Sequence, residues 1–132
     1  MKKIIFACVH NAGRSQMAAA FFNQMANPQC AQAISAGTAP GESVHPIVVT
    51  AMQEVGIDLS QAKPQKLTDA MAQTAQMLIT MGCGEACPHV PGIRREDWPL
   101  LDPKSLPLEE VRGIRDEIRN RVEALLKNEA CL

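Results

Sequence analysis

Short apolar segments alternate along this chain with segments of helical periodicity, and this alternation restricts the fold more than any other feature of the sequence. Apolar runs of strand length occur at residues 4–7, around Ile34 and at residues 76–81. The clearest helical pattern is the last one, in which apolar residues recur at spacings of three and four: Val111, Ile114, Ile118, Val122 and Leu125. Strands that alternate with helices form parallel sheets with helices on both faces, so the sequence predicts an α/β fold.

The other helical segments have recognisable compositions or boundaries. Ala, Met, Gln and Phe favour a helix over residues 15–25. A second helix is predicted to start with Pro46 at its first position and to stop at Gly56, and a third covers residues 67–74. The proline-rich residues 88–107 show neither pattern and are predicted to form a loop.

Composition limits both the size of the fold and the partners of the protein. A chain of 132 residues that is 46% hydrophobic fits one domain with a real core, over residues 1–132. The net charge of -1 and the aromatic content of 3% provide neither the basic surface nor the stacking platforms of nucleic-acid-binding proteins. The first apolar run is too short for a signal peptide or a membrane span. We therefore expect a soluble, cytoplasmic protein with no nucleic-acid or membrane partner.

The five cysteines, an odd number scattered along the chain, do not fit a secreted disulfide framework. Reactive or metal-binding thiols explain them better, because a chain with this much apolar content has an ample core. Cys30 and Cys131 have no evident partner in the sequence, and we predict that they are incidental.

Cys8 ends the first predicted strand, and ligand sites in open α/β sheets lie beyond the carboxyl ends of the strands. Arg14 follows six positions later, and the helical pattern begins at once. The segment between them is short and largely small, so its backbone N–H groups can surround an anion at the amino end of the helix: Val9, His10, Asn11, Ala12 and Gly13. These features predict an oxyanion-binding loop that serves a nucleophilic thiolate.

Arg14 and Ser15 complete the predicted loop. The planar guanidinium of Arg14 matches two oxygens of phosphate or arsenate, and its charge favours the thiolate form of Cys8. The sequence leaves two roles open for Ser15, which are a hydrogen bond to that sulfur and a cap on the helix. Taken together, the cysteine, small loop, arginine, serine and immediate helix indicate a reactive thiol rather than an ordinary buried one.

The segment CVHNAGRS, residues 8–15, resembles the Cys-x5-Arg-Ser loop of low-molecular-weight protein tyrosine phosphatases and of the arsenate reductases that share their fold. The segment RSQMA, residues 14–18, overlaps the end of this loop and is especially similar to arsenate reductases. Further similar segments lie at Ser35–Gly37, Met81–Pro88, Glu96–Pro103 and in the long final helix. The resemblance implies a single domain with a four-stranded parallel sheet flanked by helices on both faces.

The second half of the chain indicates which branch of the family it resembles. An Asp-Pro pair on a mobile loop supplies the general acid in this fold, so the resemblance assigns that role to Asp102, with Asp97 as the second choice. The phosphatases usually carry tyrosine just after this pair, whereas Lys104 follows here and the chain contains no tyrosine. Cys83 and Cys87 lie where the reductases keep their redox cysteines. The resemblance therefore favours an arsenate reductase.

This resemblance implies a disulfide relay that reduces arsenate to arsenite for arsenic detoxification. Cys8 would attack arsenic while Asp102 helps to expel water or hydroxide, and Cys83 would then attack the Cys8 sulfur and release arsenite. Cys87 would move the disulfide outward to Cys83 and Cys87. We expect no tightly bound cofactor. The electrons would come from thioredoxin or from a low-molecular-weight thiol such as mycothiol or glutathione.

Two other functions remain open from the sequence. The first is a low-molecular-weight phosphatase that hydrolyses phosphomonoesters with the same loop. The second is a thiolate metal-binding or arsenite-sensing protein, in which Cys83, Cys87 and His89 would supply three ligands and a fourth is needed to close a tetrahedral zinc site. The usual second pair of zinc ligands is missing from the sequence, so we predict no resident metal.

Overall fold

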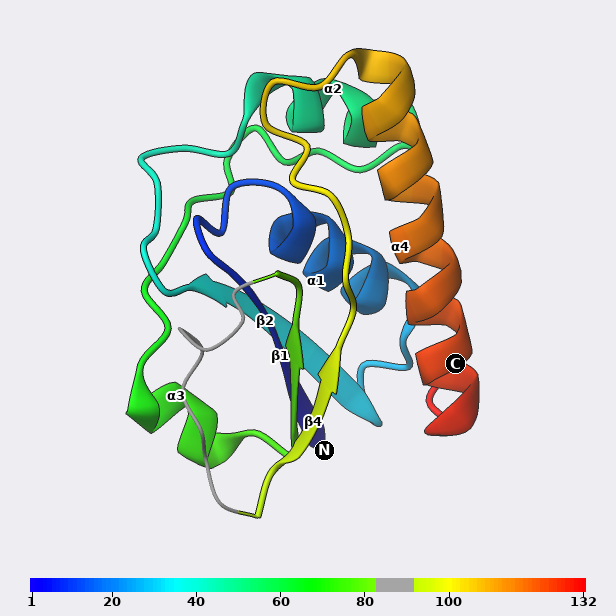
Figure 1. Ribbon diagram of the computed structural model, residues 1–132. Helices are drawn as coiled ribbons and strands as arrows, with labels where there is room; N and C mark the ends of the chain where they lie inside the picture. Colours follow the sequence, from blue (N-terminus) through cyan, green and yellow to red (C-terminus); the bar gives the residue numbers. More distant parts are fainter. Residues whose placement is uncertain (83–91) are drawn as a thin grey trace.

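The computed structural model describes residues 1–82 and 92–132. Its elements in chain order are β1 (Lys2–Cys8), α1 (Arg14–Met25), β2 (Ala31–Gly37), α2 (Pro46–Gln53), α3 (Asp69–Thr74), β3 (Met77–Thr80), β4 (Arg94–Asp97) and α4 (Leu108–Asn128). The four strands of the described ranges form one sheet in the order β2-β1-β3-β4, and all neighbouring pairs are parallel. Figure 1 shows the long α4 beside α1, while α3 lies on the other face of the sheet. The predicted α/β fold is confirmed.

Alternate residues of β1 are buried against opposite faces of the sheet. Ile4, Phe6 and Cys8 join the larger core, to which α1, α2 and α4 also contribute. Ile5 and Ala7 join the smaller core beside α3. Because successive strand residues point to opposite faces, a strand covered on both sides must be apolar at every position. The continuous apolar run in the sequence follows from this central placement.

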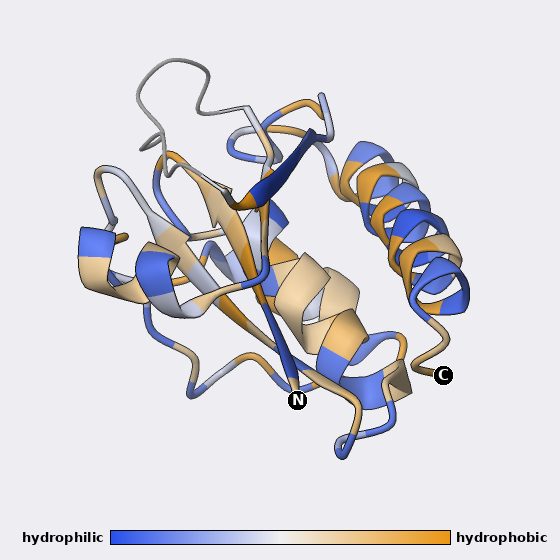
Figure 2. Ribbon diagram, turned by 90° about the horizontal axis from the view of Figure 1, so that it is seen from below, coloured by the Kyte–Doolittle hydropathy of each residue, from blue (hydrophilic) through white to orange (hydrophobic). Residues whose placement is uncertain are grey.

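The two helices α1 and α4 differ in how much of their surface is buried. In Figure 2, α1 carries mostly apolar colours, whereas polar and apolar colours alternate along α4. All of the apolar residues that predicted the final helix are buried: Val111, Ile114, Ile118, Val122 and Leu125. The helix α4 therefore covers the core with one stripe and presents its other faces to water. No helix within residues 1–82 and 92–132 is long and apolar enough to cross a membrane.

The boundaries of α2 and α3 follow local rules of helix termination. Helix α2 has Pro46 at its start as predicted, and the turn after its end contains Gly56 with a φ of 82°. Helix α3 begins two residues later than predicted, because Thr68 caps it: the Thr68 side chain accepts a hydrogen bond from the backbone N–H of Met71 at 3.2 Å.

Strand β4 corrects the prediction that residues 88–107 form only a loop. It pairs in parallel with β3, and the register runs from Met77 opposite Arg94 to Thr80 opposite Asp97. All four residues of β4 are exposed and charged, so the segment has no apolar run or alternation that would predict a strand. Charged residues are typical of edge strands, where they oppose pairing with other chains.

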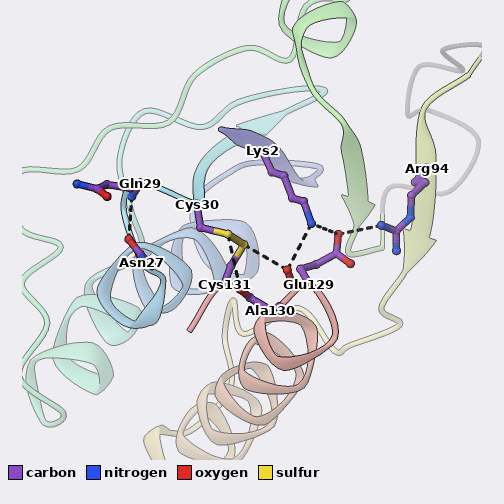
Figure 3. Close-up of a disulfide and its surroundings, with 8 residues drawn as sticks. All are labelled: Lys2, Asn27, Gln29, Cys30, Arg94, Glu129, Ala130 and Cys131. Atoms are coloured by element: carbon purple, nitrogen blue, oxygen red, sulfur yellow. Dashed lines mark hydrogen bonds and ion pairs between the residues drawn. A yellow bond between two sulfur atoms is a disulfide. The ribbon is translucent and has the colours of Figure 1, made fainter.

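A disulfide between Cys30 and Cys131 contradicts the prediction that these cysteines are incidental (Figure 3). Their Cα atoms are 5.5 Å apart although 101 positions separate them in the sequence. The backbone N–H of Asn27 donates to the Cys131 carbonyl at 2.7 Å, which holds the end of the chain against the turn before β2. Beside the disulfide, Lys2 and Arg94 both contact the Glu129 carboxylate, at 3.7 and 2.8 Å. Only the tertiary fold brings these segments together.

Candidate active site

The predicted anion loop joins the carboxyl end of β1 to the amino end of α1. Cys8 is the last residue of β1, lies opposite Gly37 of β2 and is only 1% exposed. Among the described residues it is the one free cysteine. Helix α1 begins at Arg14 with Gly13 as its N-cap residue, so the loop ends where the partial positive charge of the helix is largest. This is the geometry that the sequence predicted for an oxyanion site.

Backbone carbonyls of the loop are held by neighbouring segments on its outer side. The carbonyls of Val9 and His10 accept hydrogen bonds from Ala39 and Gly41, and the Ala12 carbonyl accepts from His45, at 2.8 to 2.9 Å. Turning carbonyls outward in a tight loop aims the N–H groups inward, which is what a backbone anion nest requires. Three loop carbonyls are thus bonded to neighbouring segments, as such a nest requires, and the binding of an anion stays a prediction.

Ser15 contacts the Cys8 sulfur rather than capping the helix. Its Oγ lies 2.8 Å from the Cys8 Sγ, and α1 has its N-cap at Gly13. The Nδ2 of Asn11 donates to the same Ser15 Oγ at 2.7 Å. Asn11 has a φ of 50°, in the left-handed region that asparagine tolerates better than most residues. From the sequence, Asn11 was expected to contribute only its backbone N–H to the loop. The contact between its side chain and Ser15 was not predicted.

Arg14 is held by contacts from two other segments. It is 7% exposed, its Nη1 donates to the Leu100 carbonyl at 3.0 Å, and its Nη2 lies 3.8 Å from the Asp102 Oδ2. The guanidinium also lies against Gly82, where a Cβ atom would collide with Arg14 Nη1. These contacts fix the guanidinium at the carboxyl end of the sheet.

The structure places Asp102 at the loop and Asp97 in a different environment. The Asp102 side chain is 43% exposed, and its Oδ1 accepts from the Lys104 backbone N–H at 3.0 Å. Asp97 ends β4, and its Oδ1 accepts from the Thr80 hydroxyl at 2.7 Å. It lines a cavity of about 440 Å³ together with Gly82, Pro99, Leu100 and Leu101. Asp102 is the carboxylate that pairs with Arg14, which favours it over Asp97 as the candidate acid.

Two histidines lie around the loop. The Nδ1 of His10 is 3.1 Å from the Ala39 carbonyl. Burial lowers the pKa of His45 below its usual value, although the nearby Asp102 carboxylate opposes this effect. His45 is therefore mainly neutral at pH 7 and adds little charge to the site.

Cys83, Cys87 and His89 lie outside the described residues. The described chain before them ends at Gly82, which contacts Arg14, and resumes at Gly92. Within the part of the chain that the structure describes, no group of three or more His, Cys, Asp or Glu residues could hold a metal ion. The structure thus brings together Cys8, Ser15, Arg14 and Asp102, and the roles of the two later cysteines stay predictions.

Comparison with known proteins gives a consistent assignment. Residues 3–130 match the family described as low molecular weight phosphotyrosine protein phosphatase. The glutaredoxin arsenate reductase of Synechocystis is 34% identical over 129 residues, covering 96% of this chain and 97% of that protein. The arsenate reductase of Staphylococcus aureus strain Newman is 32% identical over 126 residues, covering 92% and 94%.

A solved structure agrees with these relatives. The thioredoxin-dependent arsenate reductase of Corynebacterium glutamicum is 36% identical, with a TM-score of 0.84 over 98% of this chain. This chain spans 62% of that longer one. The similarity therefore covers the whole fold described above.

Proposed function

The chain belongs to the low-molecular-weight phosphotyrosine protein phosphatase family, and from this membership we propose that it is an arsenate reductase. Its reaction would convert arsenate to arsenite in the cytoplasm, as a step of arsenic detoxification. The observation that carries the proposal is the buried Cys8 in an anion-binding loop, with Arg14 and Asp102 paired at the same end of the sheet. Relatives that are named arsenate reductases and match almost the full chain support this choice among the activities of the family.

In the first step, the Cys8 thiolate attacks the arsenic atom, so a sulfur–arsenic bond forms and one arsenic–oxygen bond breaks. The loop N–H groups and the Arg14 guanidinium stabilise the negative oxygens during this exchange. Asp102 donates a proton to the departing oxygen, which leaves as water. The Ser15 Oγ lies 2.8 Å from the sulfur and would donate to the thiolate, which only accepts, and so keep it in place before the attack.

In the second step, Cys83 attacks the Cys8 sulfur. A disulfide forms between the two cysteines, the electron pair of the sulfur–arsenic bond passes to arsenic, and arsenite leaves. Cys87 then attacks Cys83, which releases the Cys8 thiolate and leaves a Cys83–Cys87 disulfide. The assignment of these two cysteines rests on the sequence.

An external thiol must return two electrons to the Cys83–Cys87 disulfide in each cycle. Thioredoxin is the proposed donor, and one similar structure is that of a thioredoxin-dependent enzyme. Glutathione and mycothiol are the alternative donors, and another relative carries glutaredoxin in its name. No tightly bound cofactor enters this scheme.

The test is multiple-turnover production of arsenite from arsenate with thioredoxin, thioredoxin reductase and NADPH, run beside the same assay with glutathione and glutaredoxin. Arsenite that tracks NADPH oxidation in the first assay supports both the reaction and the donor. Cys83→Ser should stop turnover after the first step, whereas Cys131→Ser, a matched change far from the site, should not. Wild-type turnover in Cys83→Ser would refute the relay.

Phosphomonoester hydrolysis is the second candidate function, because Cys8, Arg14 and Asp102 would also suffice for a phosphatase. The lack of tyrosine in the chain opposes a pocket for phosphotyrosine. Hydrolysis of p-nitrophenyl phosphate measured beside arsenate reduction separates the two. Rapid hydrolysis with no arsenite would make the protein a phosphatase, and slow hydrolysis beside arsenite would reflect the shared loop.

A further inference from the structure

Gln16 is buried in the first turn of α1, where three oxygen atoms surround its side-chain nitrogen. The Gln16 Nε2 lies 3.1 Å from the Asn11 carbonyl oxygen, 3.2 Å from the Asn11 Oδ1 and 3.3 Å from the Lys63 carbonyl oxygen. The residue is 7% exposed, so these contacts form away from bulk water. A buried amide with several partners costs stability if any partner is removed, so this arrangement strongly fixes Asn11.

The contacts of Asn11 determine which way its carboxamide points. Its Oδ1 accepts from Gln16 Nε2 and also from the backbone N–H of Gln65, the latter at 2.9 Å. Both partners are donors, so an oxygen must occupy this side of the carboxamide. The Nδ2 consequently faces Ser15, to which it donates at 2.7 Å.

This orientation in turn determines the direction of the hydrogen bond between Ser15 and Cys8. The Ser15 Oγ accepts from Asn11 Nδ2, so its own hydrogen is left to point elsewhere. A serine within a helix can donate to the carbonyl four residues before it, but among the described residues Ser15 Oγ bonds to Asn11 Nδ2 and Cys8 Sγ and not to the Asn11 carbonyl. The Cys8 Sγ at 2.8 Å is the remaining partner, and a thiolate can only accept.

We propose that Gln16 is a positioning residue for the nucleophile: its amide orients Asn11 so that Ser15 donates a hydrogen bond to the Cys8 sulfur. The proposal rests on the proposed role of Cys8 as the nucleophile. Gln16 does not contact the reacting atoms itself. It acts through Asn11 and Ser15, and it holds the left-handed Asn11 by two bonds from one side chain.

The test measures the rate at which iodoacetamide alkylates Cys8 at pH 7, quantified by mass spectrometry of the peptide that contains Cys8. Gln16→Met keeps the length of the side chain and removes both donors, and it should slow alkylation by about tenfold, as expected for loss of a hydrogen bond to a charged group. Gln24→Met changes an exposed residue of the same helix and should leave the rate unchanged. A wild-type rate in Gln16→Met would overturn the proposal.

A double variant separates positioning from general support of the fold. If Gln16 acts through Ser15, Gln16→Met should slow alkylation no further in a Ser15→Ala background, because the bond it orients is already absent. If instead the fold-reductions in alkylation rate caused by Gln16→Met and Ser15→Ala multiply in the double variant, Gln16 only supports the fold. Should Gln16→Met fail to fold, Asn11→Asp keeps the acceptor for Gln16, loses the donor to Ser15 and should slow alkylation equally. A wild-type rate in Asn11→Asp would also overturn the proposal.

The alkylation assay does not depend on which substrate Cys8 attacks. Slower alkylation in Gln16→Met with no arsenite production by the wild-type protein would support the positioning role and refute the arsenate reductase. Arsenite production by the wild-type protein with unchanged alkylation in Gln16→Met would support the arsenate reductase and refute the positioning role.

Discussion

Asp102 Oδ2 lies 3.8 Å from Arg14 Nη2, and this pair joins the loop after β4 to the amino end of α1. The guanidinium is buried, whereas the carboxylate is partly open to solvent. This position puts the Asp102 carboxylate within reach of a ligand bound at Arg14, which is what the proposed general acid requires. The pair therefore places the proposed proton donor beside the proposed oxyanion-binding arginine.

Asp102→Asn should lower the kcat for arsenate by about 100- to 10,000-fold, because it removes the proton donor while keeping the shape of the side chain. The KM should change much less, since Arg14 still binds the oxyanion. Steady-state kinetics measure both parameters. Asp97→Asn is the matched control, because Asp97 bonds to Thr80 rather than to Arg14, and it should keep most of the activity. A larger loss of kcat in Asp97→Asn would make Asp97 the acid.

Arg14→Lys should weaken the binding of inorganic phosphate, used as an analogue of arsenate, by at least about tenfold. Lysine keeps the charge but lacks the planar fork whose separate nitrogens can hold two oxygens side by side and donate to the Leu100 carbonyl as Arg14 does. Isothermal titration calorimetry measures the Kd. Arg94→Lys changes an exposed arginine near the disulfide and should not alter binding. Equal affinities in wild type and Arg14→Lys would contradict a bidentate role.

Gly82→Ala should reduce both stability and phosphate affinity, because a Cβ there meets the Arg14 guanidinium. Gly92→Ala is a close control: its φ of +83° resembles the +95° of Gly82, but no described residue lies within 4 Å of the added Cβ. The backbone strain should cost each variant about 1–2 kcal/mol of unfolding free energy. Only Gly82→Ala should also lose phosphate affinity. The same affinity in both variants would show that the contact with Arg14 does not matter for binding.

Reduction of the Cys30–Cys131 disulfide should lower the Tm without slowing arsenate turnover. In the chain-entropy description, a bond that closes a loop of this length contributes up to about 4–5 kcal/mol. Cys30 precedes the amino end of β2 while Cys8 ends β1, so the strand length places them about 20 Å apart. Calorimetry with and without reductant measures the shift. The double variant Cys30→Ser/Cys131→Ser should have, with and without reductant, the same low Tm as the reduced wild type. A wild-type Tm that does not respond to reductant would contradict the prediction.

Glu54 should make unfolding depend on pH in the acidic range. Its hydrogen bonds to Arg112 and, to a lesser extent, to Arg115 lower the pKa of this carboxyl to about 2 from the ordinary 4.5. Because the pKa is lowered on folding, this contribution is fully present above pH 4.5 and is lost as the pH falls toward 2. Urea unfolding at several pH values should therefore show a steeper loss of stability in this window for wild type than for Glu54→Gln. Equal slopes would show that the contact between α2 and α4 does not depend on this charge.

Local patterns predicted most elements because central strands and helices have strong signals. The continuous apolar run ending at Cys8 reflects a strand buried on both faces, and the spacing of apolar residues in α4 reflects one buried stripe. Strand β4 was missed because an exposed edge strand has no buried face to pattern its sequence. Thr68 shifted the start of α3 by a capping bond that depends on backbone geometry.

The sequence by itself determined the α/β fold, the position of Cys8 at a strand end and the loop that leads to Arg14, because these depend on residues close together in the chain. The tertiary structure decided which distant groups complete the site. Asp102 reaches Arg14 across 88 positions, Gln65 fixes Asn11 from another loop, and Cys131 meets Cys30 at the far end of the sheet. Such contacts depend on how parallel strands and helices pack in space, and local periodicity contains no information about that packing.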